Sequence, residues 1–187
     1  NYEVGAKWDI RSGLTASVAI FRLDRSNTRS PSAVPGVLVQ IGEQRTYGVE
    51  AGLVGQLTSA WQVALGYAHI NGEITTTTSA APAGRTLAQL PRDQVTLWNR
   101  YQVTDQFGVG LGLYHQSSQF ASISHATRLP GYTRIDGALY VDISDAISAQ
   151  LNVENILDET TFPNAHNDNN ISTGAPRSAR VTLNFRY

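Results

Sequence analysis

Cysteine and methionine are both missing from this chain of 187 residues. Without cysteine, the chain can form no disulfide framework, no thiolate zinc cluster and no thiol-based active site. Without methionine, we expect Asn1 to be a processing or truncation point. Long apolar runs are missing too, since no stretch reaches the about 18 apolar residues that a transmembrane helix requires. An excess of basic charge is also lacking: the formal net charge is -1. The sequence therefore argues against nucleic acid as a partner.

The chain is instead rich in segments that alternate apolar and polar residues. At its end, Val181, Leu183 and Phe185 alternate with polar side chains. Alternate residues of a β-strand point to opposite faces, and a transmembrane β-strand needs only about 9–11 of them. Nine such strands are predicted, at about 1–10, 14–24, 44–57, from 61, 92–103, from 107, 131–143, 147–154 and 179–187.

The predicted connections alternate strictly between short and long. Four are short, around 11–13, 58–60, 104–106 and 144–146, and four are long and polar, at about 25–43, 74–91, 119–130 and 158–176. Tight turns at one rim and large loops at the other are typical of outer-membrane barrels. The pattern predicts an all-β fold, an antiparallel up-and-down transmembrane β-barrel, and leaves a soluble β-sandwich as the alternative.

Aromatic residues support the membrane interpretation. Trp61 and Phe107 directly follow short turns, and Tyr187 ends the last strand on the same side. Aromatic girdles mark the two membrane interfaces of such barrels. We therefore predict that these residues, with Phe185, lie at the membrane interface.

Five segments then resemble landmarks of TonB-dependent outer-membrane receptors, in the order of that family. The segment ending in Asn155-Ile-Leu-Asp158 resembles the penultimate-strand motif, and the last fourteen residues look like the final strand. The five segments are Gln44–Glu50, Leu90–Trp98, Leu129–Gly137, Leu151–Glu159 and Gly174–Tyr187. They span almost the whole chain.

The resemblance implies an active transporter with a 22-stranded barrel and an N-terminal plug, which imports ferric siderophores with energy from the TonB–ExbB–ExbD complex. We expect residues 1–187 to form about the last nine strands, with the plug domain and the N-terminal strands absent and TonB engaged through that missing region. The aromatic end, Phe185–Tyr187, is similar to the signal that the barrel-assembly machinery reads. The loop Asn164–Arg177 and the final strand look most like those of catecholate-type ferric siderophore receptors. The alternative within the family is a hydroxamate, haem or cobalamin receptor. The alternative from another class is a passive outer-membrane pore or adhesin.

The candidate ligand residues are cations and aromatic side chains in the long loops. Ferric siderophores are often anionic, and catecholates carry rings, so arginine and aromatic residues suit them. The same residues could instead pack the loops together or face lipopolysaccharide. The candidates are Arg85, Phe120, His125, Arg128, Tyr132, Phe162 and His166.

Metal binding and catalysis have little support in the sequence. His166 and Asp168 alone do not make a metal site, and no hydrolase, zinc-protease or phosphate-loop motif occurs. We expect no enzyme, no metal site and no cofactor, the ferric siderophore being cargo. We also expect Arg134 and Asp136 to pair on the barrel wall, Arg177 to be a rim residue, and Arg180 to pair with a carboxylate such as Glu154.

Overall fold

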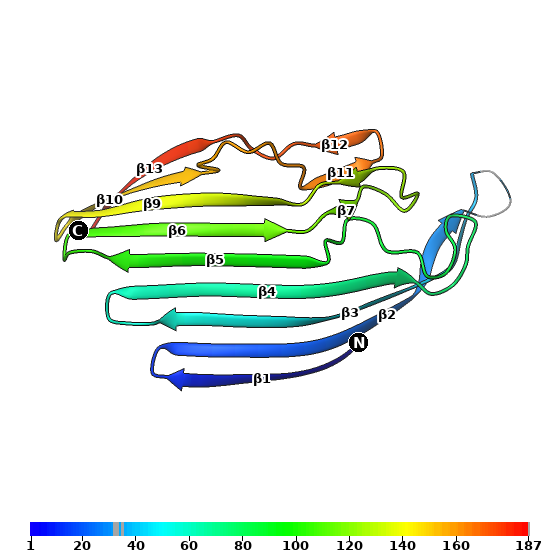
Figure 1. Ribbon diagram of the computed structural model, residues 1–187, viewed down its shortest axis with the longest axis horizontal. Coiled ribbons are helices and arrows are strands. Elements are labelled where there is room, and N and C mark those ends of the chain that lie inside the picture. Colours follow the sequence, from blue (N-terminus) through cyan, green and yellow to red (C-terminus); the bar gives the residue numbers. More distant parts are fainter. Residues whose placement is uncertain (32–33, 35, 187) are drawn as a thin grey trace.

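The protein forms one large antiparallel sheet, described by a computed structural model for residues 1–31, 34 and 36–186. In spatial order the nine strands are β1 (Tyr2–Arg11), β2 (Leu14–Pro31), β3 (Leu38–Gln56), β4 (Trp61–Ile74), β5 (Asp93–Gln102), β6 (Phe107–Gln116), β9 (Tyr132–Ser144), β10 (Ile147–Glu154) and β13 (Ser178–Phe185). In the described part, β1 and β13 are the two edges and do not pair with each other. Figure 1 shows this sheet as a single curved layer. The fold is therefore a segment of a barrel wall, as predicted. No helix among the described residues is long and apolar enough to cross a membrane.

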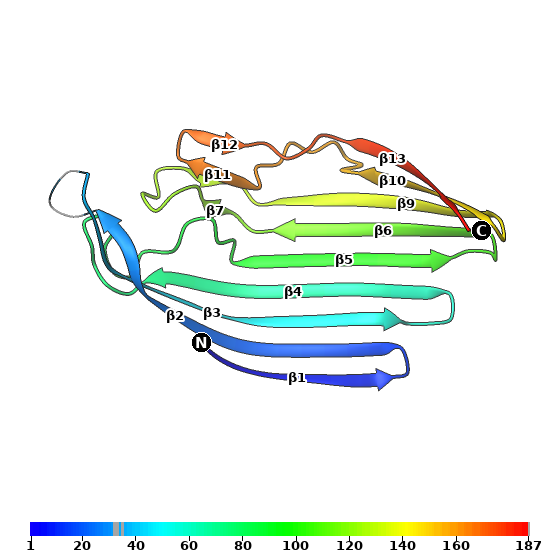
Figure 2. The same ribbon diagram turned by 180° about the vertical axis from the view of Figure 1, so that it is seen from behind.

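Short turns and long loops are sorted to opposite ends of the sheet. Figure 1 shows the connections β1–β2, β3–β4, β5–β6 and β9–β10 at the left edge and the long connections at the right. Figure 2, from behind, shows the same separation. This confirms the predicted alternation of loop lengths, which an up-and-down barrel produces because every second turn lies at the same rim.

The long loop predicted at 25–43 is shorter than expected. β2 continues to Pro31 and β3 begins at Leu38, so most of this segment is a paired arm that extends beyond the sheet (Figure 1). Pairing persists through register shifts near Thr28. The arm contacts the connection after β4, where the Thr76 hydroxyl donates to the Glu43 carboxylate at 2.7 Å and the Thr75 amide donates to the Glu43 carbonyl at 3.0 Å. Its sequence carries little alternation of polar and apolar residues. That lack of alternation made it resemble a loop.

Two other predicted loops also contain small sheets. The connection after β6 holds the hairpin of β7 (Gln119–Phe120) and β8 (Arg128–Leu129). The connection after β10 holds the hairpin of β11 (Asn164–Asn167) and β12 (Asn170–Ser172). These strands are too short for an alternating pattern to reveal them.

One face of the sheet is apolar and uncovered. Register places Val4 beside Ile20, and Leu151 beside Val181, on this outer face. Val4, Ile20 and Val181 are all more than half exposed in the structure. An apolar face of this extent suits hydrocarbon and not water, since soluble proteins rarely expose large contiguous apolar patches.

The opposite, inner face carries polar side chains and the ring of Trp98. The Trp98 ring packs directly on Gly110 and Gly112. A β-carbon added at Gly110 would lie 2.7 Å from the nearest atom of this ring, and one added at Gly112 would lie 2.6 Å from it. Beside it, the Arg100 guanidinium sits 4.3 Å from the centre of the Tyr140 ring, which allows a cation–π contact. The alternating glycines of β6 thus make room for a tryptophan on the neighbouring strand.

A corner at residues 155–158 ends β10. Asn155 is almost fully buried and has a positive φ of 53°. Its side-chain oxygen accepts from the Glu159 amide at 3.0 Å, and its amide group donates to the carbonyls of Glu159 at 2.9 Å and Ala175 at 3.2 Å. The Asn155 backbone N–H donates to Asp136 on β9 at 2.8 Å. One side chain therefore joins both stems of the long loop that follows.

The same corner holds Arg177 next to the start of β13. Asp158 accepts from the Arg177 amide at 2.8 Å, and the Arg177 guanidinium donates to the Ile156 carbonyl at 3.2 Å. Arg177 is thus a rim residue, as predicted. The expected pairing of Arg180 with Glu154 is wrong: register sets Arg180 opposite Asn152, and neither charged group forms an ion pair within the described residues.

Candidate functional site

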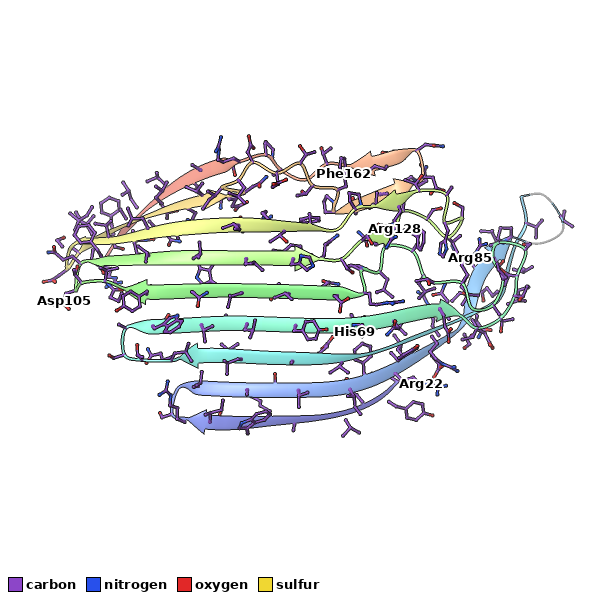
Figure 3. All side chains as sticks on the ribbon, viewed as in Figure 1. Arg22, His69, Arg85, Asp105, Arg128 and Phe162 are labelled. Atoms are coloured by element: carbon purple, nitrogen blue, oxygen red, sulfur yellow. The ribbon has the colours of Figure 1, made fainter. Side chains whose placement is uncertain are left out.

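Three long loops gather at one end of the sheet, where the predicted ligand residues lie. We call them loop A (residues 75–92), loop B (117–131) and loop C (155–177). Figure 3 shows Arg85, Arg128 and Phe162 together at this end and Asp105 at the opposite, short-turn end. The structure thus brings together candidates that are far apart in sequence.

Loop A is bonded to loop B through two of the predicted residues. The Arg85 guanidinium donates to the Ile123 carbonyl at 3.1 Å and to the Ser124 carbonyl at 3.5 Å. His125, whose φ is +62°, places its Nε2 2.7 Å from the Thr86 carbonyl, so this nitrogen donates. Arg85 and His125 therefore hold the loops together, as the packing alternative proposed.

His125 also stacks on Phe120. Their ring centroids are 3.7 Å apart, with planes tilted by only 5°. The Phe120 carbonyl accepts from the Gln89 amide at 2.9 Å, a further bond between loops A and B. Both rings are half-buried. The Phe120 and His125 rings thus form a stacked pair before any ligand binds, and part of the surface of this pair is still accessible.

Loop C is bonded to loop B mainly through Asp168, a residue singled out only as an unconvincing metal ligand. Its carboxylate accepts from the hydroxyls of Ser122 and Ser124, both at 2.6 Å, and from the Thr127 amide at 3.1 Å. The Thr127 hydroxyl donates back to the Asp168 carbonyl at 3.2 Å. Sequence reasoning missed this role because the partners lie more than 40 positions away and serine carries no signal for such a bond.

A small apolar cluster lies between loops B and C. Ala121 and Leu129 of loop B and Ala165 of loop C are buried, and Phe162 packs against them. The Gln119 side chain donates to the Pro163 carbonyl at 2.8 Å. Phe162 therefore serves loop packing in this structure, and its ring is not presented as a free stacking surface.

Arg128, Tyr132 and His166 are the predicted residues whose side chains do not bond one long loop to another. Arg128 is exposed, and its guanidinium donates to the Ser118 hydroxyl. Tyr132 begins β9 on the inner face and lies 5.7 Å from the ring of Tyr114. His166 is exposed on β11. A cation, a tyrosine pair and a histidine thus remain accessible around the bonded loops.

The inner-face contacts of Trp98 and Arg100 and the polar pairs on the outer face were not predicted. Trp98 ends the family-like segment Leu90–Trp98, but neither its packing on the β6 glycines nor the Arg100 contact was predicted, although the alternating glycines of β6 were a usable signal. On the outer face, His69 Nδ1 lies 2.7 Å from an Asp93 carboxylate oxygen. Asp93 lies inside the segment Leu90–Trp98, but that resemblance did not point to a partner at His69. The expected Arg134–Asp136 pair does form, at 2.9 Å, and Asp136 also holds Asn155.

The predicted interface aromatics lie at the short-turn end. Trp61 pairs with Tyr101 in the register, Phe185 pairs with Ile147, and both are exposed on the outer face. Phe107 begins β6 and is exposed too, while Tyr187 lies outside the described residues. The Trp61 indole donates to Asn99 at 3.1 Å. Their placement agrees with a girdle, and their role in assembly stays a prediction.

No group of three or more His, Asp or Glu side chains within the described residues is arranged to hold a metal ion. His166 and Asp168 are not held together: Asp168 is engaged by loop B, and His166 is exposed.

The bond network around Asp168 predicts an acid sensitivity of the loops. Hydrogen bonds, first from Ser122 and then from Ser124, hold the pKa of Asp168 below its ordinary value of 3.8, against the opposing effect of desolvation. A carboxyl whose folded pKa is lowered stabilises the fold fully above its ordinary pKa. That contribution is lost as the pH falls through the folded pKa.

We expect the contact between loops B and C to loosen when the pH is lowered from neutral to below 3.8. Spin labels at Ala126 and Asn169, which are exposed in loops B and C, should show a broader distance distribution in acid. In Asp168→Asn, the same titration should change the distribution little. An equally large acid effect in that variant would assign the change to another group.

Comparison with known proteins agrees with this architecture. The family model described as "TonB dependent receptor-like, beta-barrel" matches residues 1–156. The probable TonB-dependent siderophore receptor PiuA of Acinetobacter baumannii is 28% identical over 100% of this chain and 26% of its own length. The catecholate siderophore receptor Fiu of Escherichia coli K12 is 29% identical over 99% of this chain and 25% of its own.

Solved structures give the same result. The crystal structure of PiuA matches with a TM-score of 0.88 at 28% identity, over 99% of this chain and 28% of that one. The closed form of Fiu matches with a TM-score of 0.86 at 29% identity, over 99% and 27%. The chain spans about a quarter of the length of these curated relatives. It is part of an outer-membrane β-barrel, and it belongs to the TonB-dependent receptor family.

Proposed function

We propose that this chain is the C-terminal wall and loop region of an active transporter that captures ferric siderophores and imports them with TonB energy. The observation that carries this proposal is the family match over residues 1–156. Relatives that align with almost the whole chain are named as siderophore receptors, which supports it. The plug domain, the N-terminal strands and the contact with TonB–ExbB–ExbD would lie in a part of the protein outside this chain. No enzymatic role is proposed.

The open edges of the sheet favour this role over a small self-contained pore or adhesin. β1 and β13 each pair on one side only within the described residues. Unpaired strand edges are not tolerated in hydrocarbon, because their backbone groups find no water there. The nine strands therefore need further strands of a larger barrel beside them.

We further propose a catecholate-type siderophore as cargo. Fiu is named a catecholate siderophore receptor and aligns with 99% of this chain. The loop end offers the charge and the rings that such a ligand needs: exposed Arg128, the Phe120–His125 stack and the Tyr114–Tyr132 pair. Haem and cobalamin are the competing cargoes.

Growth under iron limitation tests the proposal. A strain without its own siderophore receptors, supplied with the full-length gene, should grow on a defined ferric catecholate and should need TonB for it. Ferric hydroxamates, haem and cobalamin serve as comparison cargoes. If no catecholate rescues growth and one of the comparison cargoes does, that cargo replaces the catecholate in the assignment. Growth rescue in a strain without TonB would overturn active transport.

Removing the charge of Arg128 should weaken capture. We expect Arg128→Ala in the full receptor to raise the Kd for an anionic ferric catecholate about tenfold, since a hydrogen bond to a charged group contributes about 1.5–3 kcal/mol. Titration of purified receptor by fluorescence quenching measures this. Arg186→Ala is the matched control and should keep the wild-type Kd, because Arg186 lies at the short-turn end, where its amide donates to the Ala146 carbonyl. Equal Kd values for both variants would remove Arg128 from the site.

The aromatic end should act in assembly and not in capture. We expect deletion of Phe185–Tyr187 to lower the amount of receptor inserted in the outer membrane, because the barrel-assembly machinery would lose its recognition element and the outer face would lose exposed Phe185. The Kd of the receptor that does insert should stay unchanged. Normal insertion of the deletion variant, quantified in outer-membrane fractions, would contradict this.

A further inference from the structure

The bonds among the three loops have a consequence for how they move. Loops A and B share the Arg85, His125 and Gln89 contacts, and loops B and C share the Asp168 network and the Phe162 cluster. Loops A and C also touch directly, since the Ala165 amide donates to the Gln89 side chain at 3.4 Å. Every pair of loops is therefore connected.

The two main connections use groups that are hard to replace by water. Asp168 accepts three hydrogen bonds from loop B, and bonds to an ionised carboxylate are stronger than bonds between neutral groups. Arg85 gives its donors to two backbone carbonyls of loop B, and among the described residues it has no carboxylate partner. A loop that moved alone would break these charged contacts.

We propose that loops A, B and C move as one body, and that Asp168 and Arg85 are the positioning residues that hold this body together. Neither residue needs to touch cargo. They fix the place from which Phe120, His125 and Arg128 are presented. Loops that are ordered before binding lose less conformational entropy when cargo arrives, so the ordering raises affinity.

The first test needs no cargo. Pairs of spin labels at Ala83, Ala126 and Asn169, one in each loop, report the three distances in the full receptor. This chain supplies no competing thiol. In the wild type, each pair should give one narrow distribution. Arg85→Ala should broaden the 83–126 distance and Asp168→Ala the 126–169 distance. Broad or multiple distributions in the wild type, or no broadening in either variant, would overturn the single body.

The second test rests on the proposed function. With a ferric catecholate bound, the three distances among the loops should stay constant even if their distance to a label at Asp105, on the short-turn end, changes. A change in one loop-to-loop distance alone would overturn the inference. A receptor that binds no siderophore defeats the proposed function, while the first test still decides whether the loops form one body.

Affinity separates positioning from simple damage to the fold. Asp168→Ala should raise the Kd about tenfold through lost ordering. Asp168→Asn, which keeps an acceptor for the Thr127 amide, should restore most of the affinity at neutral pH. Asn169→Ala, an exposed neighbour, is the control and should match the wild type. If the asparagine variant is as weak as the alanine variant although its loop distances stay narrow, Asp168 is not a positioning residue.

Discussion

Replacing Asn155 with alanine should destabilise the receptor by about 3–5 kcal/mol. The change removes three side-chain hydrogen bonds, to the amide and carbonyl of Glu159 and to the carbonyl of Ala175, at a site that is almost fully buried. It also places alanine at a φ of 53°, which L-residues other than asparagine and aspartate avoid. Urea unfolding of the full receptor in detergent measures the loss.

Glycine at the same position separates the two causes. Asn155→Gly loses the same hydrogen bonds but adopts a positive φ without strain, so it should be less damaging than Asn155→Ala by about 1 kcal/mol. Asn169→Ala, exposed in loop C, should leave stability unchanged. If Asn155→Ala unfolds at the wild-type urea concentration, the corner does not join the two stems.

The second large effect is expected at Gly55, where β3 passes the first short turn. Gly55 has a φ of 137°, and a β-carbon there would lie 1.9 Å from the Gly13 carbonyl oxygen. Backbone cannot yield as a side chain can, and the neighbouring Gln56 amide donates to that same oxygen at 2.8 Å. We expect Gly55→Ala to destabilise the receptor by about 3–5 kcal/mol and to reduce its insertion strongly.

Gly13 provides the matched control. It also has a positive φ, of 78°, but a β-carbon there would meet nothing within 4 Å. Gly13→Ala should therefore cost only the conformational strain, about 1 kcal/mol. The amount of folded receptor, measured by its altered gel mobility before heating, should fall clearly for Gly55→Ala and slightly for Gly13→Ala. Equal losses would mean that strain, and not the contact with Gly13, decides the outcome.

The parts of the fold that could be predicted are the strands that have one face toward lipid. Strands such as β1 and β13 alternate strictly because one face meets lipid and the other meets the interior of the barrel. The arm of β2 and β3 beyond Asp24 could not be predicted, because that environment does not continue along it. Asn155 could be noticed only through the resemblance of its motif, and the physical reason for that motif appears in its three bonds.

The candidate site was predictable in composition and not in arrangement. The arginines and aromatic residues of the long loops were identified, but Arg85 and Phe162 turn out to bind the loops to each other. What joins the loops is Asp168, whose partners Ser122 and Ser124 are ordinary in sequence and distant in the chain. Contacts of this kind depend on how two hairpins dock, which no local pattern records.

Trp98, which packs on the glycines of β6, makes the two faces of the sheet distinguishable by fluorescence. The chain has three tryptophans, and they divide by face: Trp8 and Trp61 stand on the outer face, while Trp98 lies on the inner one. A quencher dissolved in lipid reaches the first two, and a small water-soluble quencher in the lumen reaches the third. The emission of this wall segment can thus be divided into a signal from the lipid-facing side and a signal from the inner side.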